Sequence, residues 1–382
     1  MKPLSQLAEQ LPRSGIRAVM EIARETPGTI SLAVGEPSFK TPAHIIDAAC
    51  AAAYDGHTRY TPNAGINELR AAVAARYAER WKQPIAVNEV LIGSGAVNAI
   101  LASLIAVVEE GDEVLVPDPG WPNYGAQIQI ARGVQVTYPM RSENGYLPDL
   151  EELDRLVTPK TKVVITNNPS NPCGVVWPKE TVEAFMAWAQ RRDLWVIADE
   201  IYEDLVYVGK MVSAAPIDRE RVIFISGCSK SYAMTGWRIG WAIAPAALIA
   251  LSSKAQEAVV SCPSDISQRA ALAALTGPQE CVEEMRQAYH RRRDLVQSIL
   301  QPAGLLPAVP SGAFYALADM RSTGLPSQEV AIRLIKEEGI ATAPGTAFGV
   351  MAEGFVRISL ASSEEELRVG CERIVAFADR VG

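Results

Sequence analysis

The chain has 382 residues, of which 48% are hydrophobic and 21% charged. These proportions are typical of globular proteins with a large buried core, and they exclude a mostly disordered chain. The formal net charge is −8, which argues against the basic surface that a nucleic-acid-binding protein needs. The most apolar run, residues 96–108, is shorter than the roughly 20 residues that cross a bilayer. We therefore expect neither nucleic acid nor a membrane among the partners.

Two features of the sequence bear on compartment and metal content. The N-terminal segment MKPLSQLAEQLPRSGIR lacks the apolar stretch of a signal peptide. The six cysteines are scattered, with no C-x-x-C pair, which fits reduced thiols better than a disulfide framework. The histidines, His44, His57 and His290, stand at no metal-binding spacing. We expect a cytoplasmic protein without a metal site.

Helical and strand patterns alternate along the chain. Thr41 is expected to cap a helix that has Pro42 in its first turn, and a capping box at residues 363–366 opens the last helix. Other helices are expected over residues 66–81, 96–109 and 279–301. Continuous apolar runs predict strands buried on both faces at residues 114–116, 163–165, 194–198 and 222–225. The alternation predicts an α/β fold, with a mainly parallel central sheet flanked by helices and a smaller α+β part after it.

Polar side chains follow three of the predicted strands. Asn167, Asp199 and the segment at residues 226–230 each come directly after an apolar run. Open α/β sheets bind ligands at the carboxyl ends of their strands. We therefore expect these unlike functional groups to meet in one cleft.

The segment at residues 226–240 reads SGCSKSYAMTGWRIG. Small residues surround Lys230 just past a buried strand. Loss of hydration and a nearby cation such as Arg238 would lower the pKa of this lysine and make it a nucleophile for carbonyl groups. A surface lysine in a loop is the alternative for Lys230 taken alone, because lysines are usually exposed. The small residues before it and the GWRIG sequence after it favour a buried, reactive lysine.

From Gly227 to Gly240 this segment resembles the cofactor-attachment motif of the class I and II aminotransferases, and the similarity covers nearly the whole chain. The resemblance implies fold type I of the enzymes that use pyridoxal 5′-phosphate (PLP), with a large domain at residues 40–290 and a smaller one from residues 1–39 and 291–382. It implies PLP held by Lys230 as a Schiff base, with the freed amine as general base. It also implies ping-pong transfer of an amino group from an α-amino acid to a 2-oxo acid, in a homodimer with shared active sites.

The turn IGSGAVN at residues 92–98 joins a strand to a helix. Such a turn presents backbone N–H groups and the positive end of the helix to an anion. By the resemblance, Gly95, Ala96 and Val97 hold the cofactor phosphate. An ordinary tight turn is the alternative for this segment.

Three more residues are assigned to the phosphate by the resemblance. Arg238 pairs with it through two hydrogen bonds. Ser229 is a further ligand, because Gly227 stands where many relatives have serine. Tyr60 matches a tyrosine that the neighbouring subunit donates, and an exposed loop tyrosine is the alternative for it.

The cofactor ring has its own set of matched residues. Trp121, in PGWPNY, offers a flat face for stacking, with a core tryptophan as the alternative. Asn171, in NPSNPCG, and Tyr202 match residues that bind the phenolic oxygen O3′. Asp199 is a buried carboxylate that needs a cationic partner, and the resemblance makes this partner the protonated ring nitrogen N1. Asp199 and Tyr202 are therefore expected to act in catalysis beside Lys230.

The substrate is expected to lie between several of these groups. The guanidinium fork of Arg357, in FVRIS, matches the residue that grips the substrate α-carboxylate, and a surface salt bridge is the alternative. Gly35, Trp121 and Asn171 match other residues that contact the substrate. Some relatives read a side-chain carboxylate with a basic residue where Val97 stands, or with an arginine of the partner. Because residues 255–268 contain no arginine, a neutral aliphatic or aromatic donor is expected rather than aspartate.

Other functions stay open at this point. A β-eliminating lyase, a cyclase or a decarboxylase on the same scaffold would use the same residues, and an aspartate aminotransferase would differ only in its donor. A PLP-binding regulator without enzymatic activity would need an added DNA-binding module, for which 382 residues leave no room.

Overall fold

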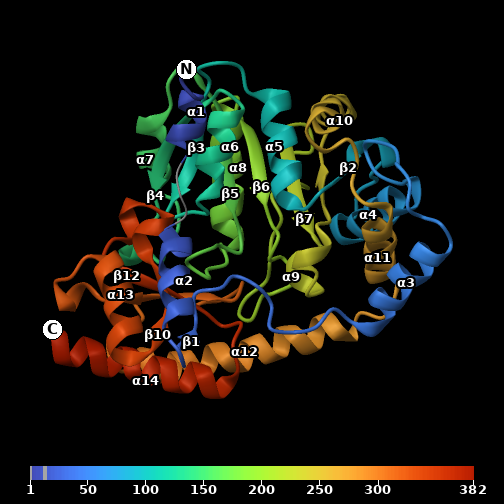
Figure 1. The fold of residues 1–382 in the computed structure, drawn as a ribbon. Helices are drawn as coiled ribbons and strands as arrows, with labels where there is room; N and C mark the ends of the chain where they lie inside the picture. Colours follow the sequence, from blue (N-terminus) through green and yellow to red (C-terminus); the bar gives the residue numbers. More distant parts are fainter. Residues whose placement is uncertain (1, 12–14) are drawn as a thin grey trace.

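The computed structural model describes residues 2–11 and 15–382. A seven-stranded sheet in the order β2-β8-β7-β6-β5-β3-β4 lies at its centre (Figure 1). Among these strands β8 runs antiparallel to both neighbours and the others are parallel, so the expected fold is confirmed. The strands are β2 (Val90–Gly93), β3 (Glu113–Asp118), β4 (Val134–Pro139), β5 (Thr161–Asn167), β6 (Trp195–Asp199), β7 (Val222–Gly227) and β8 (Gly240–Ile243).

Helices cover both faces of this sheet, which explains why its strands read as continuous apolar runs. Neighbouring residues of β6 point to opposite sides, so Val196 and Ile197 belong to different apolar clusters. The cluster of Val196 includes helices α3 (Ala43–Tyr54), α4 (Asn67–Trp81), α8 (Lys179–Arg191) and α11 (Asp265–Thr276). The cluster of Ile197 includes α5 (Ala96–Val107), α6 (Asn123–Ile130) and α10 (Ala246–Val260).

A second, smaller sheet is built from the C-terminal part of the chain. Its antiparallel order is β11 (Ala343–Pro344), β12 (Phe355–Ser359) and β9 (Tyr315–Asp319), and α13 (Ser327–Glu338) and α14 (Glu364–Val381) pack beside it. The N-terminal strand β1 (Ile30–Ser31) pairs with β10 (Ile340–Ala341), which brings the first and last parts of the chain together. Helix α2 (Gly15–Glu25) packs on α13, whereas α1 (Gln6–Gln10) and α7 (Leu150–Leu156) lie near the top of Figure 1.

Helix α12 (Glu280–Leu300) connects the two regions and runs from the side of α11 to α14 (Figure 1). It crosses residue 290 without a break. The predicted division into domains at residues 40 and 290 therefore stays a prediction, with its second boundary inside a continuous helix.

The helix boundaries show one success and one error of the capping predictions. Ser363 caps α14 as expected, because its Oγ accepts from the N–H of Glu366 at 3.2 Å. Thr41 was expected to cap α3, but that is wrong: α3 begins at Ala43 after Pro42, and no side chain caps it. The Thr41 hydroxyl instead donates to the carbonyl of Ala233 at 2.7 Å, so a tertiary contact has replaced the local one.

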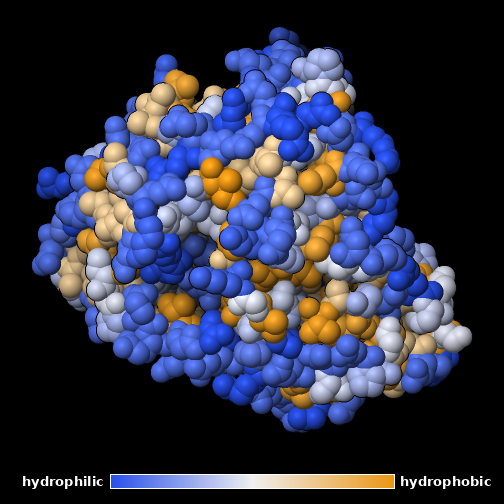
Figure 2. All heavy atoms as spheres, turned by 180° about the vertical axis from the view of Figure 1, so that it is seen from behind, coloured by the Kyte–Doolittle hydropathy of each residue, from blue (hydrophilic) through white to orange (hydrophobic). Residues whose placement is uncertain are grey.

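The helices found in the described ranges include none that is both long and apolar enough to cross a membrane. The face of the molecule seen in Figure 2 is mostly hydrophilic, with apolar side chains in small patches between the polar ones.

Candidate active site

A cavity of about 640 Å³ lies where the carboxyl ends of the central strands meet the smaller sheet. Asn167 and Asp199 line it from the ends of β5 and β6, and Lys230 follows β7. Tyr315 and Arg357 line it from β9 and β12. The polar groups that follow the predicted strands thus meet in one cleft, as expected.

Lys230 lies on the one-turn helix α9 (Cys228–Ser231), directly after β7. Its Nζ donates to the carbonyl of Gly35 at 2.8 Å, and it lies 5.9 Å and 5.6 Å from the ring centres of Tyr202 and Phe314. Burial and, to a smaller extent, the positive charge of Arg357 together lower the pKa of Lys230 to about 8. The lowered pKa agrees with the expectation, and Arg238 contributes to it as expected, although less than Arg357.

The start of helix α5 forms a cradle for an anion. Within the part of the chain that the structure describes, the N–H groups of Ala96 and Val97 have no hydrogen-bond partner. Gly95 has φ +83°, and a Cβ on it would lie 2.6 Å from Nη2 of Arg238. A Cβ on Gly240 would lie 2.3 Å from the nitrogen of Ala96. The absence of side chains at these glycines therefore leaves free amides and a guanidinium side by side, as phosphate binding requires.

Two other residues assigned to the phosphate occupy different surroundings. Ser229 lines the cavity next to Lys230. Tyr60 is not among the residues that line the cavity of its own chain, and its side chain is 91% exposed in the connection between α3 and α4. A single chain thus brings Ser229, but not Tyr60, to the cavity.

Asp199 is the buried carboxylate of the site. Its Oδ2 accepts from the hydroxyl of Tyr124 at 2.6 Å, and its Oδ1 accepts from the N–H of Ile201 at 3.3 Å. Burial raises the pKa of Asp199 to about 6, although both hydrogen bonds favour the ionised form. Sequence reasoning missed Tyr124, whose ring packs edge-on against Trp121 with 5.3 Å between ring centres. Its position three residues after Trp121, at the start of a helix, was the available signal.

A pair of tyrosines lies on the opposite wall. The hydroxyl of Tyr202 is 3.1 Å from that of Tyr315, a residue that the sequence did not single out. A Cβ on Gly35 would lie 2.5 Å from the Tyr315 hydroxyl, so this position accepts only glycine without movement of the ring. Burial raises the pKa of Tyr202 well above its usual range, which keeps its hydroxyl protonated as a donor.

Arg357 is a buried cation with no ion pair to any carboxylate in the described chain. Its Nη1 donates to Oδ1 of Asn171 at 3.1 Å and its Nη2 to the carbonyl of Ala33 at 2.5 Å. The guanidinium lies over the rings of Tyr315 and Phe348, 4.4 Å and 4.6 Å from their centres. The alternative of a surface salt bridge is therefore wrong. A buried charge without a counterion favours an anionic ligand, and a carboxylate matches the guanidinium fork.

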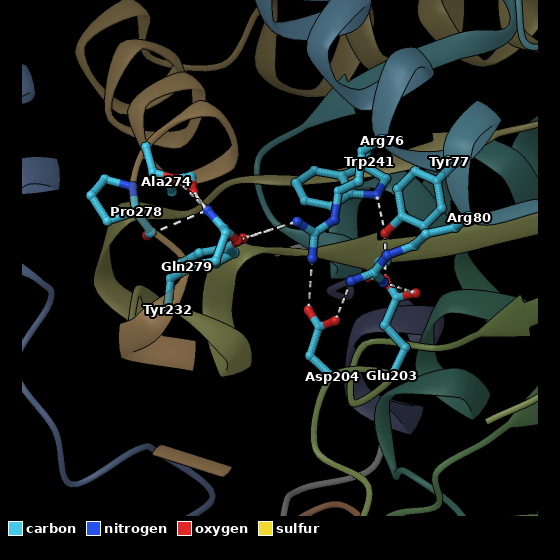
Figure 3. A network of polar contacts seen from close by, with 12 residues as sticks. Arg76, Tyr77, Arg80, Glu203, Asp204, Tyr232, Trp241, Ala274, Pro278 and Gln279 are labelled. Carbon is cyan, nitrogen blue, oxygen red and sulfur yellow. Dashed lines mark hydrogen bonds and ion pairs between the residues drawn. The ribbon is translucent and has the colours of Figure 1, made fainter. Parts of the chain in front are cut away.

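A partly buried polar network connects the segment that contains Lys230 to α4 (Figure 3). Arg80 binds Glu203 at 2.9 Å and Asp204 at 2.5 Å, directly after Tyr202 in sequence. Arg76 binds Asp204 at 3.1 Å and the hydroxyl of Tyr232 at 3.2 Å, two residues after Lys230. The network thus links the residues that follow Tyr202 and Lys230 in sequence to helix α4. Its members are far apart in sequence, so no local sequence pattern predicted the network.

These residues fit pyridoxal phosphate. The cradle at α5 suits the phosphate, Lys230 is an amine with a lowered pKa, and the buried Asp199 carboxylate suits a protonated ring nitrogen. The fold and the site together define the chain as a PLP-dependent enzyme.

Comparison with known proteins gives the family. The sequence profile of class I and II aminotransferases matches residues 27–374. The aspartate/prephenate aminotransferase of Thermus thermophilus is 38% identical over all of both chains, and aromatic-amino-acid aminotransferase 2 of Thermococcus litoralis is 39% identical over 97% of each. A structure of the Thermus thermophilus aspartate aminotransferase with maleate superposes with a TM-score of 0.94, at 38% identity, over 98% of this chain and 100% of that one. The chain belongs to the class I and II aminotransferases and is a PLP-dependent aminotransferase of amino acids and 2-oxo acids.

Proposed function

We propose that this aminotransferase takes its amino group from a neutral, aliphatic or aromatic amino acid and passes it to a 2-oxo acid, with Lys230 as the general base. One observation carries the proposal: an amine whose pKa is about 8 shares a cavity with a buried arginine that has no carboxylate partner in the described chain. Such a cavity can hold an amino acid by its carboxylate and accept its proton.

The residues divide the work by position. Arg357, with Asn171 and Gly35 beside it, orients the α-carboxylate of the substrate. Lys230 Nζ would then take the proton from the substrate Cα as the general base. When bound, PLP withdraws electrons from the substrate Cα and so makes that proton acidic. Asp199 would keep the ring nitrogen N1 protonated, Tyr202 would donate to O3′, and Trp121 would cover the ring. Gly95, Ala96, Val97, Ser229 and Arg238 would hold the phosphate.

The preference for a neutral donor rests on where the basic residues lie. Val97 places no charge at the start of α5. Arg269, one residue beyond the stretch at 255–268, is engaged by Glu68 at 3.1 Å and Asp265 at 3.2 Å. Aspartate is the second candidate donor, because Arg24 of α2 lines the cavity and has no ion-pair partner in the described ranges.

The donor is tested by mixing the holoenzyme with single amino acids and following the change in cofactor absorbance. We expect a higher kcat/KM for leucine, phenylalanine or another neutral donor than for aspartate. The Arg24→Met variant serves as the control for the second candidate. A higher kcat/KM for aspartate, lost in Arg24→Met, would contradict the proposal and assign Arg24 to the side-chain carboxylate.

We further infer a homodimer in which Tyr60 completes the phosphate site of the partner. Its 91% exposure in one chain supports this, because a phosphate ligand without a target in its own cavity needs a second subunit. The test mixes subunits that carry Tyr60→Ala with subunits that carry Lys230→Ala. If Tyr60 acts in the partner, a mixed dimer has one intact site and activity exceeds the sum of the parents. No recovery, with Tyr60→Ala impaired alone, would contradict the arrangement.

A cytoplasmic location is also inferred, since all six cysteines are free thiols, as is usual in a reducing compartment. Cell fractionation with detection of the protein outside the cytoplasm would contradict it.

A further inference from the structure

The loop at residues 57–66, which we call the Tyr60 loop, combines an exposed tip with a buried attachment. The side chain of Tyr60 is 91% exposed, whereas Ile66 at the end of the loop is 5% exposed. Within the described residues, no hydrogen bond holds the exposed side chain of Tyr60. Its position must therefore come from the way the rest of the loop is held.

Gln268 of α11 holds the loop from one side. It is fully buried, and its Oε1 accepts from the N–H of Ile66 at 2.8 Å. Its Nε2 donates to the hydroxyl of Thr61 at 3.0 Å and to the carbonyl of Pro263 at 3.0 Å. The N–H of Ile66 only donates and the carbonyl of Pro263 only accepts, so these partners fix the orientation of the amide. One side chain therefore clamps both ends of the segment that follows Tyr60.

Gln256 of α10 holds the loop from the other side. It too is fully buried, and its Nε2 donates to the carbonyls of Asn63 at 2.5 Å and Ile92 at 2.9 Å. Its Oε1 has no partner in the described chain, so this amide keeps a buried acceptor unsatisfied. An apolar residue of this size would avoid the cost of burying that unsatisfied oxygen. We therefore attribute the role of Gln256 to its Nε2 group, which donates both hydrogen bonds.

The loop and the cofactor cradle are joined at Ile92. This residue lies in β2 directly before the last strand residue, Gly93, and four residues before Ala96, whose amide belongs to the cradle. The N–H of Ile92 donates to the carbonyl of Ala64 at 2.9 Å. Gly65 has φ +99°, and a Cβ on it would lie 2.5 Å from Ile92 Cγ1, so the loop backbone touches this strand end. Any shift of the loop is therefore coupled to the cradle of its own subunit.

We propose that Gln256 and Gln268 are positioning residues that fix the Tyr60 loop against the end of β2, so that Tyr60 is presented to the cofactor phosphate of the partner subunit. The inference rests on the proposed role of Tyr60 and goes beyond it, because it states what holds an exposed side chain in place. The buried amides act through the loop and touch neither substrate nor cofactor.

The test measures the rate at which the holoenzyme releases its cofactor on dilution into buffer that contains inorganic phosphate. Loss of the Tyr60 hydrogen bond to a charged group in Tyr60→Phe should speed release about tenfold. Gln256→Met and Gln268→Met should each speed it about fivefold. In the Tyr60→Phe background the same changes should have no further effect, because residues that act through one another are not additive.

The matched control is Gln83→Met. Gln83 also donates to a backbone carbonyl, that of Pro216 at 2.9 Å, but it has no contact with the Tyr60 loop, so release should not change. If a buried variant does not fold, Thr61→Ala removes one bond of Gln268 from the loop side, and the same pattern is expected with a smaller effect.

The remaining outcomes separate failure of the positioning role of Gln256 and Gln268 from failure of the phosphate-binding role of Tyr60. Faster release in the Gln variants that adds fully to that of Tyr60→Phe would overturn the inference, since the glutamines would then act on the fold or the cradle alone. Unchanged release in both Gln variants would overturn it as well. No effect of Tyr60→Phe itself would instead reject the proposed role of Tyr60.

Discussion

The cavity around Lys230 and the Tyr60 loop serve the same proposed cofactor but are built in opposite ways. In the cavity, functional groups from both sheets are buried and oriented by direct hydrogen bonds, as Asp199 is by Tyr124 and Arg357 by Asn171. In the loop, the Tyr60 side chain is exposed, and two buried amides hold the residues that follow it in sequence. A single chain therefore brings the cavity groups together, whereas the proposed role of Tyr60 requires a second chain.

This contrast predicts effects of different size. In the proposed roles, groups inside the cavity act on the rate of proton transfer. Tyr60, in its proposed role, acts on cofactor retention as one of several phosphate contacts. Changes inside the cavity should therefore reduce the reaction rate far more than changes in the loop.

The largest effect is expected for Asp199→Asn. The variant should keep its cofactor but transfer an amino group about 10³-fold more slowly, because the charge that keeps N1 protonated is gone. The measurement is the rate of the half-reaction with a saturating donor. Glu200→Gln is the control: Glu200 is equally buried, accepts from the N–H of Ala214 at 2.9 Å and does not line the cavity, so its rate should change little. A mild effect in Asp199→Asn, no larger than that of Tyr60→Ala, would contradict the expected difference between the cavity and the loop.

A smaller effect is expected for Tyr124→Phe, and it depends on pH. The hydroxyl of Tyr124 bonds the ionised form of Asp199 and lowers its pKa, so its removal raises that pKa above about 6. The ionised form is then lost at a higher pH as the pH falls, and the acid limb of the kcat profile should move upward by about one pH unit. Tyr138→Phe is the control, because Tyr138 is also buried but donates to the carbonyl of Ile165. An unshifted acid limb would show that Tyr124 does not tune Asp199.

Much of the fold followed from local patterns in the sequence. The continuous apolar runs predicted the strands β3, β5, β6 and β7, since burial on both faces leaves no room for polar residues. The helices expected at residues 66–81 and 279–301 lie at Asn67–Trp81 and Glu280–Leu300. Thr41 failed as a cap because capping is a local rule, and the hydroxyl found a partner 192 residues away.

The site residues also fall into two groups: those that stand in sequence motifs and those whose contacts arise only in the folded chain. Lys230, Asp199 and Arg357 stand in motifs, and the structure brings them to one cavity. Tyr315 was not predicted, because its partnership with Tyr202 arises only when the smaller sheet meets the central one. Arg238 lowers the pKa of Lys230 as expected, but the larger charge effect of Arg357 was not predicted, because Arg357 is remote in sequence and reaches the cavity from the smaller sheet.

The attachment of the cofactor to Lys230 is the claim on which both regions depend. Borohydride reduction of the yellow holoenzyme followed by peptide mapping tests it directly. We expect the pyridoxyl group on the peptide that contains Lys230, and no labelled peptide from Lys230→Ala treated in parallel. A pyridoxyl group on another lysine, or on none, would contradict the account of the site.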